Sequence, residues 1–221
     1  MQKKFSGIQN KIIAITGTTS GIGKAIKEKF EKENWQVISL NLPEFDVRDV
    51  KKIEKLKLPY LDVFVNNAGI MPLVDFEKTT LKDWEDTINT NLRGPFFLSK
   101  KVIPFIKDKG HLINIASISG IYPEKEFVAY AISKVGIIML TRCLAKRYGN
   151  RIFVNSISPG FVRTNLTGQP IPDELIDMIP MKRVAQPEEV ADLVWFIVNN
   201  HYLNGANIVF DGGIFVKYYG P

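Results

Sequence analysis

A tyrosine and a lysine stand four residues apart in this sequence, at Tyr130 and Lys134. The apolar run around them predicts a helix over about 129–148, and this spacing places both side chains on one helix face. A phenol with an unperturbed pKa near ~10 is a poor base at neutral pH, but a neighbouring ammonium stabilises the phenolate. The pair therefore predicts one tuned acid/base group, although the same spacing also occurs by chance on helix surfaces.

Two further polar residues are candidates for the same site. Ser117 follows a predicted strand over 111–116, and Asn91 lies at the start of a helix predicted over about 92–106. Each alone is typical of a cap or a loop. Together they are expected at the sheet edge that also holds a glycine-rich turn.

That turn is Thr16–Gly23, between a predicted strand over 11–16 and a predicted helix over 21–33. Its glycines permit a tight turn and let a diphosphate approach the backbone, while the helix N-terminus supplies free N–H groups. The spacing is Gly-x-x-x-Gly-x-Gly, so in isolation an ordinary polar connection explains it as well.

The elements that must position these residues alternate between strand and helix. Strands are predicted at 11–16, 36–42, 62–66, 111–116, 151–157 and 206–210, and helices at 21–33, 80–88, 92–106 with a bend near Pro95, 129–148 and 187–197. This alternation predicts an α/β fold of the Rossmann type, a doubly wound parallel sheet in a single domain over residues 1–221. Ligands of such sheets bind beyond the carboxyl ends of the strands.

The composition fits one globular domain and narrows the function classes. The 221 residues are 45% hydrophobic and 24% charged. The net charge of +6 would suit a nucleic-acid-binding protein, but the lysines alternate with glutamates and form no aromatic–basic stripe. No run approaches a membrane span, and no secretory signal is expected. One cysteine, Cys143, excludes an intrachain disulfide and favours a cytoplasmic protein, and His111 and His201 have no metal-site spacing.

The ordered motifs together resemble the short-chain dehydrogenase/reductase family over nearly the whole chain. They are Thr16–Gly23, Asn66–Gly69, Asn91–Gly94, Ser117 with Gly120, Tyr130 with Lys134, Pro159 and Gly160 with Thr164, and Asp211–Gly213. The resemblance implies an NAD(P)-dependent oxidoreductase that transfers a hydride between nicotinamide and a carbonyl or alcohol substrate.

The same resemblance implies a role for each motif. Tyr130 would exchange a proton with the substrate oxygen and Lys134 would lower its pKa and bind the nicotinamide ribose. Ser117 would hydrogen-bond the substrate, and Asn91 would hold a relay water. Ile22 is expected at the diphosphate, Asp46 and Val47 at adenine, Asn67 at the neighbouring ribose, and Pro159, Gly160, Val162 and Thr164 beside the nicotinamide. Further expected cofactor contacts are Gly17, Ser20, Gly21, Gly23, Asn41, Ala68 and Gly69.

The stretch after the second strand departs from the family pattern. Asn41 to Phe45 leads directly to Asp46, so we expect the helix that usually follows to be missing or reduced to a turn, with a more open adenine side. Asn41 is neither the carboxylate that binds ribose hydroxyls nor a cation for a 2′-phosphate. Because the glycine turn also lacks a cation, we favour NAD over NADP; Lys24 or Arg48 could reverse this preference.

Substrate and assembly stay open at this stage. No basic cluster marks the segment 165–181 that should overhang the substrate, so a small sugar, polyol or ketone is as acceptable as a 3-oxoacyl thioester. Helix 129–148 is apolar almost all round, which favours burial on two sides, and the resemblance implies a homodimer or homotetramer. The alternative function is a catalytically silent dinucleotide-binding regulator, which would not need the full set of Asn91, Ser117, Tyr130 and Lys134.

Overall fold

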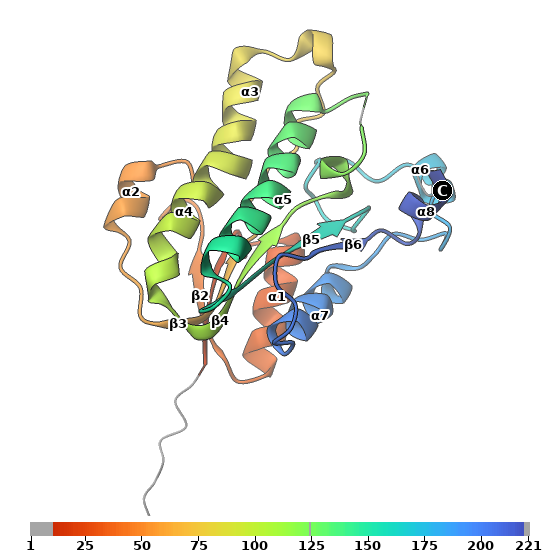
Figure 1. Cartoon of the computed structure of the whole chain (residues 1–221). Helices are drawn as coiled ribbons and strands as arrows, with labels where there is room; N and C mark the ends of the chain where they lie inside the picture. The colour runs from red at the N-terminus through yellow and green to blue at the C-terminus, as the bar shows by residue number, and fades with distance from the viewer. Residues whose placement is uncertain (1–10, 124, 219–221) are drawn as a thin grey trace, which may run out of the picture.

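The structure, a computed structural model, describes residues 11–123 and 125–218. In these residues six parallel strands form one sheet in the order β2-β1-β3-β4-β5-β6 (Figure 1). The strands are β1 (Ile12–Thr16), β2 (Gln36–Leu40), β3 (Leu61–Asn66), β4 (Ile106–Ile115), β5 (Phe153–Pro159) and β6 (Asn207–Phe210). The winding reverses between β1 and β3, and the carboxyl ends of these two strands flank the crevice where ligands of such sheets bind. The predicted doubly wound α/β fold is confirmed.

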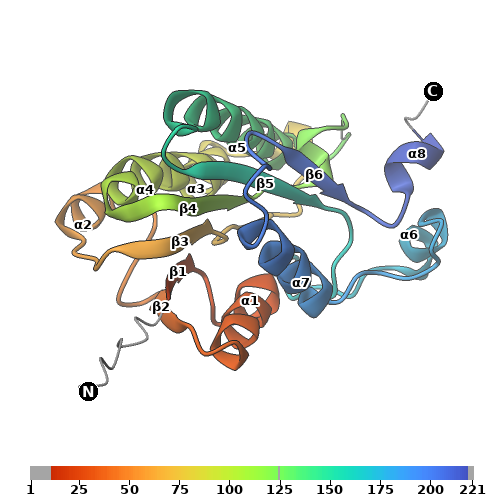
Figure 2. The same cartoon turned by 60° about the horizontal axis from the view of Figure 1, so that its bottom comes forward.

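Helices cover both faces of the sheet (Figure 2). One face carries α1 (Gly21–Lys32) and α7 (Pro187–Val198), and the other carries α3 (Leu81–Ile88), α4 (Gly94–Val102) and α5 (Val128–Tyr148), with α2 (Val50–Lys55) beside α4. Strand side chains alternate between the two cores: Ile13 and Ile15 pack with α1 and α7, whereas Ala14 packs on the α4 side. Burial on both faces explains why these strands are continuously apolar.

The segment after β2 is short, as predicted. Residues 41–48 form turns with no helix or strand, and α2 begins only at Val50, behind Asp49, whose side chain accepts from Lys52 N–H at 3.0 Å. Phe45 and Val47 turn inward and are buried there. β2 is therefore an edge strand of the described sheet.

The predicted helix over 92–106 has the wrong boundaries. A π-helical turn (Asn89–Arg93) joins α3 to α4, so the irregularity lies just before Pro95. Gly94 N–H bonds to the Asn89 carbonyl, one residue further back than in an α-helix. α4 ends at Val102, and the turn Ile103–Phe105, which contains Pro104, leads into β4.

Helix α5 corrects the expectation that no segment approaches a membrane span. Its 21 residues have a mean hydropathy of 1.5 in the most apolar window, enough to cross a membrane by length and composition alone. Core helices pass the same test, and 39% of that window is buried inside the protein. The buried face includes Ser133 and Lys134.

His111 gives the fold a specific sensitivity to acid. Its ring is 3% exposed, and neither nitrogen has a hydrogen-bond partner among the described residues. Burial, followed by the charges of His201 and Lys11, lowers the pKa of His111 from 6.5 to about 4. The unfolded chain therefore binds a proton between pH 6.5 and 4 that the folded protein excludes, so stability falls as the pH drops through that window.

We expect this difference to remove roughly 3 kcal/mol from the free energy of unfolding between pH 7 and pH 4. Urea unfolding at both pH values will measure it, and His111→Phe should flatten the dependence. Tyr202→Phe, at a position 98% exposed, serves as the control. An equal acid sensitivity in wild type and His111→Phe would rule out His111 as its source.

Candidate active site

Polar contacts from the end of β3 hold the glycine turn between β1 and α1. Gly17 has φ +73° and Gly21 φ +54°, conformations that glycine adopts without steric cost. Asn67 Nδ2 donates to the carbonyls of Thr16 and Gly17, each at 2.9 Å. Thr16 Oγ1 accepts from the N–H groups of Asn67 and Ala68, also at 2.9 Å each. The ends of β1 and β3 are thus joined around the turn.

This turn fits the diphosphate of a dinucleotide. A Cβ atom on Gly23 would lie 2.0 Å from the Gly17 carbonyl oxygen and 2.4 Å from Asn67 Nδ2, so a larger residue would displace the turn. Within the described residues the side chain of Ser20 makes no capping hydrogen bond to α1. The first N–H groups of the helix, including that of Ile22, are therefore available to an anion.

The end of β2 presents neutral groups to the glycine turn. Thr18 N–H donates to Asn41 Oδ1 at 2.7 Å, and Asn41 Nδ2 donates to Thr18 Oγ1 at 2.9 Å. The Thr18 hydroxyl donates in turn to Ser39 Oγ at 2.9 Å. A carboxylate at this position would bind the ribose hydroxyls and a cation would bind a 2′-phosphate, but an amide and two hydroxyls lie there instead.

Asp46 and Val47 follow on the same side of the crevice. Arg48 donates to the Asp46 carboxylate, with Nη2 to Oδ2 at 2.8 Å, and these hydrogen bonds hold the pKa of Asp46 below its usual range. Arg48 also pairs with Asp86 at 3.4 Å. Its charge is thus already shared between two carboxylates.

Tyr130 and Lys134 lie on the buried side of α5, with 6% and 5% of their surfaces exposed. Lys134 Nζ is 5.5 Å from the centre of the Tyr130 ring and donates to the Ile115 carbonyl at 2.9 Å. Burial lowers the pKa of Lys134 from 10.5 to about 8. The ammonium still predominates at neutral pH, next to the phenol, at the carboxyl end of β4.

Ser117 follows β4 and caps a short 3-10 turn, Ile118–Gly120. Its Oγ accepts from Ser119 N–H at 3.2 Å, and the residue is 8% exposed. A Cβ on Gly120 would lie 2.7 Å from the Lys134 carbonyl carbon, so this turn packs directly on the backbone of α5. The Ser117 loop and the Tyr130 helix are thereby brought together.

Asn91 lies in the π-helical turn and faces the segment after β3. Its Oδ1 accepts from Ile70 N–H at 2.9 Å, and its Nδ2 donates to the Ile70 carbonyl at 2.8 Å and to Ser133 Oγ at 3.2 Å. A Cβ on Gly69 would be 3.2 Å from Asn91 Oδ1 and 3.7 Å from Lys134 Nζ. Asn91 and Lys134 therefore converge on Gly69, next to the segment that holds the glycine turn.

The loop after β5 closes the site from the other side. Pro159 ends the strand, Gly160 N–H donates to the Phe210 carbonyl at 2.9 Å, and Val162 is buried beside Ala185. Thr164 meets the glycine turn, because a Cβ on Gly21 would lie 3.1 Å from Thr164 Cγ2. A hollow of about 230 Å³ lies there, lined by Ser20, Gly21, Lys24, Ala25, Glu28, Arg163, Thr164, Asn165, Pro187 and Glu188.

The predicted residues thus meet at one sheet edge, and two further side chains take part to which the sequence analysis gave no role. Ser133 accepts from Asn91 and donates to the Tyr130 carbonyl at 2.6 Å, so it links two candidate catalytic residues. The Thr16 hydroxyl links β1 to β3. Their only sequence signals are a small polar residue inside a helix and one at the end of an apolar strand. A phenol, an ammonium and a serine hydroxyl beside a dinucleotide cradle can move a proton to or from a substrate oxygen.

No group of three or more metal-binding side chains occurs in residues 11–123 and 125–218. His111 and His201 do come together, with ring centres 5.8 Å apart, but His111 lies four residues before the carboxyl end of β4, opposite Phe153 at the start of β5.

Comparison with known proteins gives consistent matches over most of the chain. Residues 44–215 match the family described as Enoyl-(Acyl carrier protein) reductase. The 3-oxoacyl-[acyl-carrier-protein] reductase FabG of Thermotoga maritima is 33% identical, covering 95% of this chain and 99% of that protein. The meso-2,3-butanediol dehydrogenase of Serratia marcescens is 32% identical, covering 92% and 94%.

Solved structures match equally broadly. A short-chain dehydrogenase/reductase of Brucella melitensis, titled glucose/ribitol dehydrogenase, has a TM-score of 0.88 at 25% identity over 93% of this chain and 96% of its own. The aldohexose dehydrogenase of Thermoplasma acidophilum has a TM-score of 0.85 at 27% identity, covering 95% and 96%. BdcA, solved in complex with NADPH, has a TM-score of 0.85 at 26% identity, covering 91% and 93%.

Proposed function

The chain belongs to the short-chain dehydrogenase/reductase family, and from this premise we propose that Tyr130 is the acid/base of its reaction. The protein is an oxidoreductase that acts on carbonyl or alcohol groups with NAD or NADP. The bound dinucleotide supplies or accepts the hydride, while the protein supplies placement and proton transfer. The observation that carries the proposal is the buried Tyr130–Lys134 pair at the sheet edge that holds the glycine turn.

We propose that the Tyr130 hydroxyl gives its proton to a substrate carbonyl oxygen during reduction and takes it back during oxidation. The Lys134 ammonium favours the phenolate form electrostatically and lies where it can also bind the nicotinamide ribose. Ser117 orients the substrate oxygen. Asn91, which approaches Lys134 beside Gly69, fixes the end of a proton path to solvent.

Turnover of acetoacetyl-CoA, diacetyl or a hexose with either cofactor, read as nicotinamide absorbance, tests the proposed reaction. Bound NADH without any turnover would instead support a silent regulator.

The cofactor contacts that we propose follow the crevice from adenine to nicotinamide. They are Asn41, Asp46 and Val47 at the adenosine, Gly17, Ser20, Gly21, Ile22 and Gly23 at the diphosphate, Asn67, Ala68 and Gly69 along the ribose, and Tyr130, Lys134, Pro159, Gly160, Val162 and Thr164 at the nicotinamide end. Support comes from the cradle that a Cβ on Gly23 would fill and from the close approach of Gly21 to Thr164.

We propose NAD as the preferred cofactor, although a similar protein was solved with NADPH. At the end of β2, Asn41 is bonded to Thr18, and the nearby Arg48 is paired with Asp46 and Asp86. Lys24 pairs with Glu28 at 3.7 Å. A 2′-phosphate would thus find no uncommitted cation among these residues.

We expect NADH to bind roughly ten times more tightly than NADPH, because burying extra phosphate charge without a partner is costly. Fluorescence titration of the wild-type protein with each cofactor at one ionic strength will measure the ratio. Adding a cation with Asn41→Arg should shift the ratio toward NADPH. Tighter NADPH binding by the wild type would reverse the assignment.

Substrates of two sizes fit this proposal. The relatives named above are a 3-oxoacyl-[acyl-carrier-protein] reductase and a meso-2,3-butanediol dehydrogenase. The segment 165–181 that follows Thr164 contains only one short helix, α6 (Asp173–Met178). We call this segment the lid, because we propose that it covers the substrate. We therefore propose either a small sugar, polyol or ketone, or a 3-oxoacyl thioester; the substrate panel will distinguish them.

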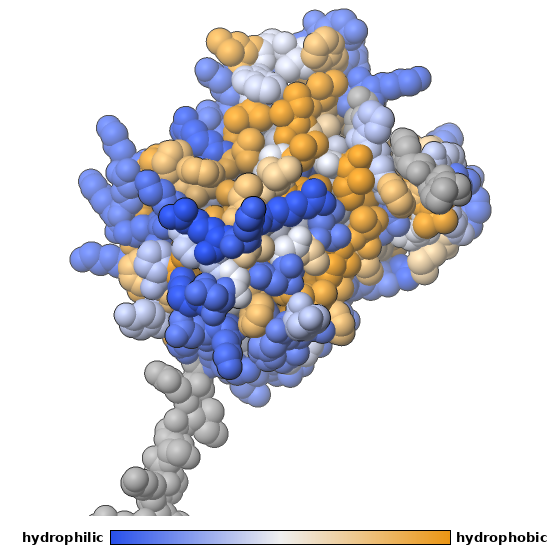
Figure 3. Space-filling model, viewed as in Figure 1, coloured by the Kyte–Doolittle hydropathy of each residue, from blue (hydrophilic) through white to orange (hydrophobic). Residues whose placement is uncertain are grey.

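We propose that the protein is a cytoplasmic homodimer or homotetramer that pairs through α5. Apolar side chains gather along this helix in the view of Figure 1, as Figure 3 shows. Ile132, Val135 and Met139 are 45%, 51% and 53% exposed and share one helix face, and Phe96 of α4 is 48% exposed. An apolar stripe of this kind is typical of a protein–protein interface.

Val135→Lys should therefore dissociate the assembly at assay concentration, because it places a charge within the stripe. Sedimentation velocity will measure the change. Lys146→Glu, which alters an exposed charge near the end of the same helix, is the control. A monomeric wild type would contradict the proposed assembly.

A further inference from the structure

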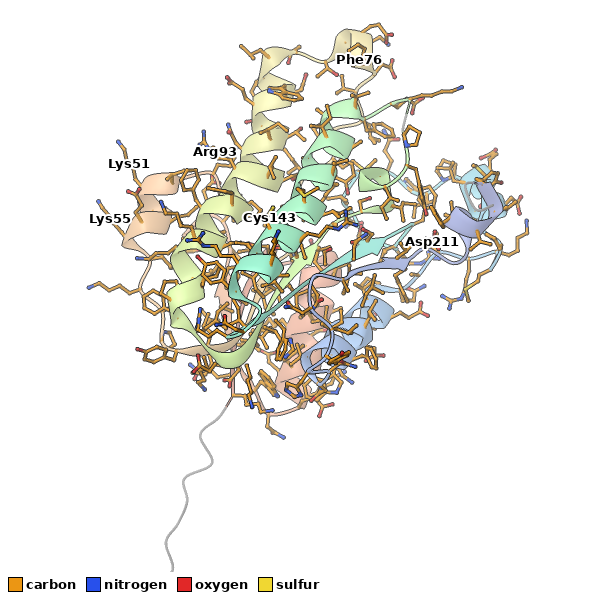
Figure 4. The ribbon with its side chains drawn as sticks, in the orientation of Figure 1. Lys51, Lys55, Phe76, Arg93, Cys143 and Asp211 are labelled. Atoms are coloured by element: carbon orange, nitrogen blue, oxygen red, sulfur yellow. The ribbon has the colours of Figure 1, made fainter. Side chains whose placement is uncertain are left out.

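We propose that Asp211 is a positioning residue for the substrate site. It connects the segment after β6 to Tyr122 and thereby fixes the Ser117 loop and the lid relative to each other. The expected effect on kinetics rests on the proposed function, whereas the expected effect on the structure does not. Asp211 directly follows β6, where the chain turns toward α8 (Ile214–Tyr218), as Figure 4 shows.

Both carboxylate oxygens of Asp211 accept hydrogen bonds. Oδ1 accepts from Gly213 N–H at 2.9 Å, and Oδ2 accepts from Phe215 N–H at 2.7 Å. Oδ2 also accepts from the Tyr122 hydroxyl at 3.1 Å, across 89 residues of sequence. The bonds from Gly213 and Phe215 lie within the segment that begins α8. The bond from Tyr122 connects this segment to the Ser117 loop.

Tyr122 transmits this contact toward Ser117. It lies five residues after Ser117, is 6% exposed, and its N–H donates to the Ile118 carbonyl at 3.0 Å. Its ring stacks on Phe215 with centres 5.1 Å apart and planes 18° apart. The side chain is thus held at both ends, by the turn that Ser117 caps and by α8.

Asp211 also touches the loop proposed to hold the nicotinamide. A Cβ on Gly160 would lie 3.0 Å from both Cα and Cβ of Asp211. A shift of the Asp211 backbone would therefore displace the Gly160 backbone directly. The carboxylate stands between two walls of the proposed site, the Ser117 loop and the loop after β5.

The lid rests on the residues that follow Asp211. A Cβ on Gly212 would be 2.7 Å from Ile179 Cγ2, and Met181 N–H donates to the Gly212 carbonyl at 3.3 Å. Lys217 Nζ donates to the Met178 carbonyl at 3.1 Å. A separate apolar cluster joins all three parts: Ile118, Tyr122, Ile179, Val184 and Ile214, with Phe161, Ile171, Ile176 and Phe215 at its edge.

Hydrogen exchange tests the structural half without a substrate. Tyr122→Phe removes one hydroxyl and keeps the stacked ring, while Asp211→Ala removes the whole acceptor. Each should speed amide exchange about tenfold in both 117–122 and 173–181. Tyr202→Phe, at a site 98% exposed, is the matched control and should change neither segment. Changes confined to 211–215, or a change in only one of the two segments, would overturn the proposal.

Steady-state kinetics with diacetyl or acetoacetyl-CoA, whichever the wild type reduces, tests the positioning half. We expect KM for that substrate to rise about tenfold in Tyr122→Phe, with kcat within about threefold and the NADH Kd within about twofold. Adding Tyr122→Phe to Asp211→Ala should give no further rise, because the hydrogen bond between the two residues is already lost. Additive effects, or an equal loss of NADH affinity, would count against the proposal. If the wild type showed no turnover, the proposed function would be refuted, and the hydrogen-exchange result alone would decide the role of Asp211.

Discussion

Replacing Tyr130 by phenylalanine should lower turnover by about 10³-fold, while NADH binds nearly as in the wild type. The substitution deletes one oxygen and keeps the aromatic ring of a residue that is only 6% exposed. Without the hydroxyl no group at that position can exchange a proton with the substrate oxygen. The glycine turn, which we propose binds the diphosphate, is built from other residues. Measuring kcat and the NADH Kd of the same preparation will separate the two effects.

Tyr148→Phe is the matched control, because Tyr148 ends the same helix and its hydroxyl accepts only an exposed bond from Arg147 among the described contacts. It should leave kcat within about twofold. If Tyr130→Phe retained activity within tenfold of the wild type, Tyr130 could not be the acid/base. Loss of NADH binding in the same variant would point to a disturbed site rather than to a missing proton donor.

The fold could be predicted because its signals are local. The alternation of apolar strands with amphipathic helices requires only neighbouring residues, and the confirmed order of elements follows from it. The glycine turn is equally local: Gly23 is required because its own neighbour, the Gly17 carbonyl, leaves no space for a Cβ. The absence of a helix directly after β2 could be predicted from the short stretch before Asp46.

Other features could not be predicted, because they depend on contacts between distant residues. The start of β4 at Ile106 depends on its pairing with Leu61, which overrides the helical pattern predicted through 106. The π-helical turn aims Asn91 at Ile70, 21 residues earlier, and Ser133 completes that network from another helix. The sequence alone gives no sign of these pairings, nor of the bond between Tyr122 and Asp211.

Helix α5 is long and apolar enough to cross a membrane, which the expectation of no membrane-length run overlooked. A helix that buries one face on the sheet and presents a second apolar face is apolar all round, as membrane helices are. The signal that separates the two cases is the buried polar set within it, Tyr130, Ser133 and Lys134. Such groups are costly to bury and are kept where they have a role.

Lys134→Met should therefore show activity and stability moving in opposite directions. We expect turnover to fall by about 10²- to 10³-fold, because the phenol loses its ammonium neighbour. We expect the free energy of unfolding at pH 7 to rise by about 1 to 2 kcal/mol. Burial lowers the pKa of Lys134 from 10.5 to about 8, which corresponds to roughly 3 kcal/mol spent on holding the buried charge. Lys134→Met removes this destabilisation, but it also loses the hydrogen bond to the Ile115 carbonyl.

The pH dependence identifies the source of that gain. Between pH 8 and 10.5 the unfolded wild-type chain binds a proton at residue 134 that the folded protein has released, so wild-type stability rises with pH across this window. The variant lacks this contribution, so its advantage should shrink from pH 8 upward, vanish at roughly pH 9 and reverse by pH 10.5. Urea unfolding of both proteins at pH 7, 9 and 10.5 measures the gap. Lys146→Met, a change at an exposed position of the same helix, should alter neither stability nor turnover. A gap that stayed constant with pH would mean that the buried ammonium is not what destabilises the wild type, and turnover within tenfold of the wild type would remove Lys134 from the reaction.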